Sequence, residues 1–149
     1  MKFLKMEDLD LAEKRVLIRE DFNVPIDNGQ IMNGARIQAA LPTIKLAQSS
    51  AKSIILMSHL GRPSEGEPIS VQPELSLAPV ARYLSVLLGC EVSLISNYLN
   101  GLNFLDQCGS GIFMLENVRI NLGEHSNEEL LSRRYADLCD VFVMDAFGT

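Results

Sequence analysis

The stretch Arg15-Val-Leu-Ile-Arg19 is a short apolar run rich in β-branched residues, and the polar segment Glu20-Asp-Phe-Asn23 follows it at once. A continuous apolar run of this length is typical of a strand that is buried on both faces of a parallel sheet. Four further candidate strands follow along the chain, of which only the second alternates apolar and polar side chains: Ser53–Met57, Glu91–Ile95, Ile112–Leu115 and Val141–Met144. The pattern predicts a parallel sheet.

Stretches with helical spacing separate these runs. An apolar stripe over residues 37–44 predicts one helix, which Pro42 should kink or shorten because proline lacks the backbone N–H. A second stripe over residues 80–88 predicts a helix with Pro79 near its first turn and Gly89 just past its end.

A third helix is expected from Ser126 to about Leu138, because Glu129 would complete a capping box with Ser126. Strands that alternate with helices in this order form a parallel sheet covered on both faces. The sequence therefore predicts an α/β fold with a doubly wound, Rossmann-like parallel sheet and helices on both faces. The Gly- and Pro-rich segment 61–68 is interpreted as a loop over the sheet edge, since a helical pattern resumes soon after it.

Length and composition suit one domain with a hydrophobic core, because the 149 residues are 47% apolar. Apolar residues form no block of about 18 or more, and the N-terminus lacks a signal-like run, so a cytoplasmic location is expected. The net charge of −6 argues against nucleic-acid and membrane partners, which bind through broad Lys/Arg surfaces. Any anion site must be local.

Cysteine and histidine usage gives no sign of a disulfide framework or a metal site. The three cysteines, Cys90, Cys108 and Cys139, form no C-x-x-C pair and are expected to be buried, inert thiols. The two histidines are far apart and lack metal-ligand spacing, so no metal is expected.

Four of the expected strands are followed by polar clusters. In an open parallel sheet the carboxyl ends of the strands share one edge, where ligands bind. The clusters, with the start of the first helix, place five candidates at that edge: Asn23, Arg36, His59, Arg62 and Arg119. Guanidinium groups pair bidentately with phosphate and carboxylate, so the chemistry favours a phosphorylated small acid.

Each candidate also has a purely structural interpretation. Arg36 is then a solvated helix residue, Arg119 a surface ion-pair partner and His59 a structural histidine. Asp21 and Asp145 would only cap or turn the chain, because aspartate bonds nearby backbone N–H groups. Their joint placement after strands favours a site.

The familiar nucleotide-binding motifs are missing from the sequence. No G-x-x-x-x-G-K-[ST] occurs, and Gly109-Ser-Gly111 precedes a strand instead of opening a helix. We interpret it as a turn.

Five motifs, taken together, resemble the phosphoglycerate kinase family in order and spacing. They are Arg19-Glu-Asp-Phe-Asn-Val-Pro25, Arg36-Ile-Gln-Ala-Ala-Leu-Pro-Thr-Ile44, Ser58-His-Leu-Gly-Arg-Pro63, Glu116-Asn-Val-Arg119 and Asp145-Ala-Phe-Gly-Thr149. The resemblance implies a two-domain, monomeric enzyme of glycolysis that transfers a phosphoryl group between 1,3-bisphosphoglycerate and ADP. Its N-terminal domain would bind 3-phosphoglycerate, and its C-terminal domain would bind Mg-ADP or Mg-ATP.

The family pattern also implies roles for individual residues, with Arg36 as the catalytic arginine. Asp21 and Asn23 would hold the glycerate end of the substrate, while residues 59–62 and Arg119 would hold its 3-phosphate. The full substrate-binding set implied by the resemblance is Asp21, Phe22, Asn23, Arg36, His59, Leu60, Gly61, Arg62 and Arg119. No metal or nucleotide is expected on these residues.

Departures from the family pattern are few: Glu20, Gln38 and Ile120. Family members continue beyond the last motif, so residues 1–149 are expected to be an incomplete N-terminal substrate-binding domain, inactive without the nucleotide-binding domain. Two alternatives are a non-catalytic phosphoglycerate-binding fragment and an unrelated α/β domain with a chance anion site.

Overall fold

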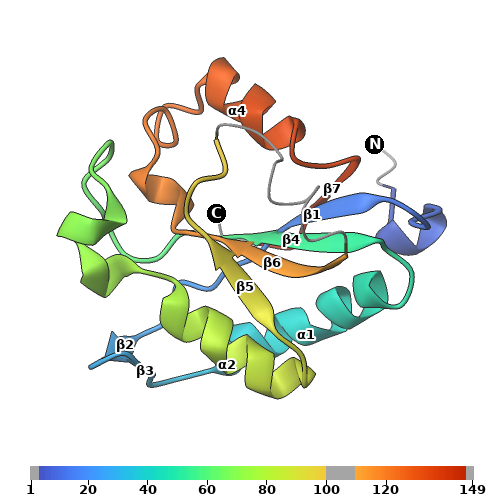
Figure 1. Ribbon diagram of the computed structural model, residues 1–149, viewed down its shortest axis with the longest axis horizontal. Helices are drawn as coiled ribbons and strands as arrows, with labels where there is room; N and C mark the ends of the chain where they lie inside the picture. Colours follow the sequence, from blue (N-terminus) through green and yellow to red (C-terminus); the bar gives the residue numbers. More distant parts are fainter. Residues whose placement is uncertain (1–3, 100–109, 147–149) are drawn as a thin grey trace.

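A five-stranded, all-parallel sheet forms the centre of the computed structural model, which describes residues 4–99 and 110–146 (Figure 1). Its strands are β1 (Arg15–Arg19), β4 (Ser53–Met57), β5 (Val92–Ile95), β6 (Gly111–Leu115) and β7 (Val141–Met144). Their order is β5-β6-β4-β1-β7. Every predicted strand is present, with bounds within one residue of those expected.

Helices cover both faces of the sheet, as Figure 1 shows. The helices α1 (Ala35–Gln48) and α2 (Ala78–Leu88) lie below it in that view, and α4 (Glu129–Ala136) lies above. Alternate residues of β1 belong to two different buried clusters, Val16 and Ile18 to one and Leu17 to the other, because successive side chains of a strand point to opposite faces. The predicted doubly wound α/β fold is confirmed.

The helix α2 matches its prediction at both ends. Pro79 occupies the first turn, and Gly89 ends the helix in the left-handed conformation with φ of +68°. Leu84 is fully buried against the sheet, whereas Val86 on the same helix is 82% exposed.

Pro42 does not shorten α1, although the sequence predicts a kink or a shorter helix there. The helix runs through Pro42 without a break for 14 residues. Pro42 and Gln38, whose carbonyl would receive the missing hydrogen bond, are both exposed, so water can bind that carbonyl. The proline therefore costs the helix little.

The predicted start of the third helix is wrong. Helix α4 begins at Glu129, and its N-cap is Glu128 without a side-chain cap. The chain turns tightly before the helix, since Asn127 has φ of +54° and Glu128 N–H donates to the carbonyl of Gly123. Ser126 donates to the same carbonyl at 3.3 Å and is not a cap.

A short hairpin was not predicted. Strands β2 (Ile26–Asp27) and β3 (Gln30–Ile31) are joined by Asn28 and Gly29, which have φ of 48° and 74°. Asn-Gly is the strongest short signal for such a turn. The other short elements are the 3₁₀ helices η1 (Met6–Asp8), η2 (Ile69–Val71), η3 (Pro73–Leu75) and η4 (Val118–Ile120).

Segment 61–68 is a loop, as predicted, and it is bound to the chain around η4. Gly66 N–H donates to the carbonyl of Ile120 at 2.7 Å, and His125 N–H donates to Glu65 at 3.1 Å. In the described part of the chain no helix is long and apolar enough to cross a membrane.

Two of the cysteines are less buried than expected. Cys90 and Cys139 are free thiols of intermediate exposure, and burial raises the pKa of Cys139. Cys108 and the start of the predicted turn at 109–111 lie outside the described residues.

Leu84→Ala is expected to lower the free energy of unfolding by about 2–5 kcal/mol, because it leaves a cavity in a closely packed core. Val86→Ala on the same helix is the control and should change it by about 0.5 kcal/mol or less. Urea unfolding measures both, and equal losses would contradict the assigned burial.

Candidate anion-binding site

The loops that follow β1, β4 and β6 are hydrogen-bonded to one another at the carboxyl edge of the sheet. Phe22 N–H donates to Ser58 Oγ at 2.9 Å, and Gly61 N–H donates to Asn23 Oδ1 at 2.9 Å. The predicted convergence of the strand-end clusters is therefore observed for these three loops.

Asn117 joins two of these loops from within the protein. Its fully buried amide accepts from Leu60 N–H at 3.2 Å and donates to the carbonyl oxygens of Leu60 and Leu75 at 2.8 and 2.9 Å. It also accepts from Arg119 N–H at 3.2 Å and so caps η4. The motif containing Asn117 was recognised in the sequence, but the sequence did not show this role.

Glu116 is a buried carboxylate with a structural role. It accepts from Ser76 Oγ and Leu77 N–H, both at 2.7 Å, and from Asn117 N–H at 2.9 Å. Leu77 is the N-cap of α2, where the helix dipole favours a negative charge. These contacts stabilise the buried charge and fix the end of β6 to the start of α2.

Arg36 lies in the first turn of α1, as predicted, and reaches the loop after β1. Its Nη1 donates to Asn23 O at 2.9 Å and to Asp21 Oδ1 at 3.3 Å. Asp21 Oδ1 also accepts from Asn23 N–H at 3.1 Å, so Asp21 has the turn-forming role that its structural interpretation predicts. The Arg36 side chain remains 57% exposed and can be approached by a ligand.

His59 is 7% exposed and faces positive groups. Burial, followed by the charges of Arg119 and Arg19, lowers the pKa of His59 to about 4. The ring is therefore neutral at physiological pH. Arg19, which the sequence interpretation did not include, lies with Nη2 3.5 Å from His59 Nδ1.

Arg62 and Arg119 complete the positive groups at this edge. Arg62 is exposed and Arg119 is half-buried. Within residues 4–99 and 110–146, neither guanidinium forms an ion pair. Both remain available to an anion.

Three residues of the predicted binding set have local structural roles. Phe22 and Leu60 bury their side chains in the core, and their N–H groups donate within the protein. Gly61 has φ of +62°, and an added Cβ would lie 2.6 Å from Leu75 Cδ2. Their contact with a ligand stays a prediction.

Glu20 and Asp145 form a carboxyl pair beside Arg36. Glu20 is 1% exposed, and its Oε1 has no hydrogen-bond partner in the described residues. Burial, a hydrogen bond with Asp145 and the charges of Asp145 and Asp21 raise the pKa of Glu20 to about 10. Glu20 is thus protonated at neutral pH and adds no negative charge to the site.

Among the described residues, no three His, Cys, Asp or Glu side chains are placed to hold a metal ion. The acidic groups near the site are instead committed to Arg36 or to the start of α2, and Glu20 holds a proton. These residues do not fit Mg²⁺, and we assign no step to a metal here.

Fold and site together define a doubly wound α/β domain with a positive, hydrogen-bonding site at the carboxyl edge of its sheet. The family model for phosphoglycerate kinase matches residues 6–149. The chain belongs to the phosphoglycerate kinase family.

Two solved structures support this assignment. The chain is 48% identical to phosphoglycerate kinase from Coxiella burnetii, with a TM-score of 0.88 over 99% of this chain and 36% of that one. It is 28% identical to the enzyme from Pyrococcus horikoshii, with a TM-score of 0.77 over 99% of this chain and 37% of that one. The chain thus spans about a third of the length of either protein.

Glu20→Gln should remove a pH-dependent loss of stability. The pKa of Glu20 rises from its ordinary 4.5 to about 10 on folding. Its contribution to the stability of the folded protein is therefore complete below pH 4.5 and is lost as pH rises toward 10. The free energy of unfolding of the variant, relative to wild type, should grow by up to about 1.4 kcal/mol per pH unit across that window. Denaturant unfolding from pH 5 to 9 measures it.

Glu74→Gln, at an exposed position in η3, is the control and should follow the wild-type pH profile. If Glu20→Gln also follows that profile, Glu20 is ionised in the folded protein.

Proposed function

We propose that this chain forms the 3-phosphoglycerate site of a phosphoglycerate kinase, which transfers a phosphoryl group reversibly between 1,3-bisphosphoglycerate and ADP. The observation that carries the proposal is the hydrogen-bonded set of strand-end loops, which brings Arg36, His59 and Arg119 to one edge of a chain of this family.

In this proposal the phosphate of the substrate binds to Arg62, Arg119 and His59. The two guanidinium groups supply charge, and the neutral imidazole supplies a directed N–H. Asp21 and Asn23 hold the glycerate end. The site takes a small-molecule partner and neither nucleic acid nor membrane.

The chemistry needs no general base among these residues. In the direction that consumes ATP, the nucleophile is the carboxylate of 3-phosphoglycerate, which is already ionised at neutral pH. Catalysis then depends on positioning and charge stabilisation, and a guanidinium directed at the transferring phosphoryl group stabilises the charge on its equatorial oxygens. Arg36 has this catalytic role in our proposal.

The nucleotide, as Mg-ADP or Mg-ATP, is assigned to the second domain that the two-domain architecture of the family implies. The proposal extends to a cytoplasmic, monomeric enzyme of glycolysis. Without a nucleotide domain, residues 1–149 are expected to bind substrate but not to turn it over.

Titration of the ¹⁵N-labelled chain with 3-phosphoglycerate tests the site directly. Amide signals around His59 and Arg119 should shift, while those near the exposed β2–β3 hairpin should not. The absence of any shift at millimolar ligand would contradict the proposed site. Phosphoryl transfer to ADP by residues 1–149 alone would contradict the expected inactivity.

Arg36→Ala, in an enzyme of full family length, is expected to lower kcat by ~10²–10³ and to change KM little, because the contact acts on charge that develops in the transition state. Arg133→Ala is the control, since Arg133 also forms an exposed ion pair, with Glu129 on α4. Steady-state kinetics measures both variants. A rise in KM with unchanged kcat would make Arg36 a binding residue only.

A further inference from the structure

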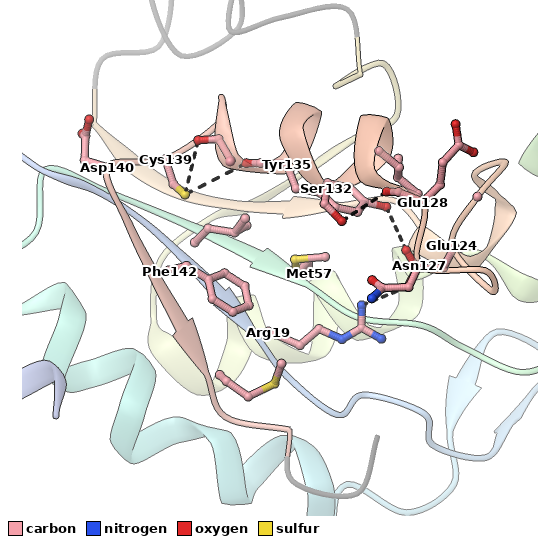
Figure 2. A pocket seen from close by; sticks show the side chains of 15 residues that line it. Arg19, Met57, Glu124, Asn127, Glu128, Ser132, Tyr135, Cys139, Asp140 and Phe142 are labelled. Carbon is pink, nitrogen blue, oxygen red and sulfur yellow. Dashed lines mark hydrogen bonds and ion pairs between the residues drawn. The ribbon is translucent and has the colours of Figure 1, made fainter. Parts of the chain in front are cut away.

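Arg19 is the last residue of β1, and its guanidinium lies in the pocket between the sheet and α4 (Figure 2). Only 10% of its side chain is exposed, compared with 28% for Arg15 at the other end of the same strand. A buried guanidinium is costly unless it is paired and hydrogen-bonded. The burial of the Arg19 guanidinium is therefore explained by the groups that pair with it.

The Arg19 guanidinium has two side-chain partners in the part of the chain that the structure describes. Nη1 lies 3.4 Å from Glu124 Oε1, in an ion pair whose carboxylate side chain is 16% exposed, and Nη2 lies 3.5 Å from His59 Nδ1. A guanidinium has donors and no acceptor, so Nδ1 must be the acceptor in this long hydrogen bond. A neutral imidazole with an accepting Nδ1 carries its proton on Nε2.

Glu124 is held in turn by the residues around α4. Its Oε2 accepts from the hydroxyl of Tyr135 at 3.3 Å, and that hydroxyl accepts from Asn121 Nδ2 at 2.8 Å. Burial raises the pKa of Tyr135, so the phenol stays protonated and able to donate. Figure 2 shows Arg19, Glu124 and Tyr135 among the residues that line this pocket.

The network extends one step further into the core. Asn121 Nδ2 also donates to the hydroxyl of Tyr98 at 2.7 Å, and Tyr98 donates to the carbonyl of Glu116 at 3.0 Å. Tyr98 is 2% exposed. The carboxylate that holds Arg19 is therefore fixed to two elements, α4 and the end of β6.

The other ring nitrogen of His59, Nε2, is left without a protein partner among the described residues. In residues 4–99 and 110–146, Nε2 makes no hydrogen bond. The charged groups that act on the ring come from β1, the loop after it, α1 and η4. They are Arg119, Arg19 and Arg36, which disfavour its cationic form, and Asp21, which favours it. Burial is the main reason that the ring stays neutral, and the three positive groups add to it because they outweigh the one carboxylate.

We propose that Arg19 and Glu124 are a positioning pair, which holds the neutral ring of His59 in the Nε2–H tautomer so that it can donate to an anionic oxygen. That the anion is the phosphate of 3-phosphoglycerate rests on the function proposed above. The assignment of the Nε2–H tautomer does not depend on that function.

The tautomer is measured by ¹⁵N–¹H correlation spectra of the protein labelled on its histidines, with the His59 signals identified by their loss in His59→Gln. Wild-type protein at pH 7 should give the pattern of a neutral ring protonated at Nε2. A wild-type ring that is protonated at Nδ1, or on both nitrogens, overturns the proposal.

Two variants separate positioning from simple packing. Arg19→Met keeps the apolar part of the side chain but removes the donors, so His59 should become a mixture of tautomers. Arg19→Lys keeps a charged donor and should restore the wild-type pattern. Arg15→Met is the matched control, because Arg15 lies on the same strand and also pairs with a carboxylate, Asp140, at 3.1 Å.

If Arg19→Met does not fold, Glu124→Gln replaces it. It leaves Arg19 in place but weakens the contact that orients it, so partial mixing of the tautomers is expected. A wild-type pattern in every folded variant of Arg19 or Glu124 overturns the proposal.

Binding of 3-phosphoglycerate, measured by calorimetry, tests the link to function. Arg19→Met should weaken binding about tenfold or more, through loss of an oriented donor to a charged group, and Arg15→Met should leave it unchanged. If wild-type protein shows the Nε2–H tautomer but does not bind this ligand, the proposed function fails and the positioning role stands. If wild-type protein binds 3-phosphoglycerate but shows another tautomer, the positioning role fails and the proposed function stands.

Discussion

The buried amide of Asn117 is the interaction on which the rest of the site depends. With no exposed surface, it hydrogen-bonds to the loop after β4 and to the chain before α2, and it caps the turn that carries Arg119. These backbone groups have no water to replace Asn117, so its loss would leave them unsatisfied, at about 1–3 kcal/mol for each buried group. Parallel strands end at a common edge, but hydrogen bonds of this kind set how their loops lie there.

The charge of the site differs from the charge of the chain because of how nearby carboxyl groups are used. The chain has a net charge of −6, yet the edge around His59 is positive. Glu20 holds a proton, and Glu116 is bound at the start of α2. Arg19 and Arg36 neutralise Glu124 and Asp21. Arg62 and Arg119 are left without ion pairs in the described residues, so an acidic protein can bind an anion locally.

The sequence predicts the strands well because burial on both faces of a parallel sheet leaves an apolar run that is visible without tertiary information. It also places Arg36 and His59 correctly at the sheet edge. It does not identify Arg19 as part of the site, because an arginine at the end of a strand is exposed in most settings and only the contacts with Glu124 and His59 define its role. The start of α4 is missed for a related reason. A positive φ at Asn127 moves the helix start past a pattern that resembles a cap.

A neutral histidine suits a site that already contains several guanidinium groups. A further positive charge would be repelled by Arg19 and Arg119 and would add little in a region where charge is already supplied. A neutral N–H supplies direction instead, because a hydrogen bond fixes the orientation of a bound anion as well as attracting it. The low pKa of His59 also keeps its protonation constant between pH 6 and 8. The histidine then donates in one state across that range, and its orientation is set by the network that extends from Arg19 to α4.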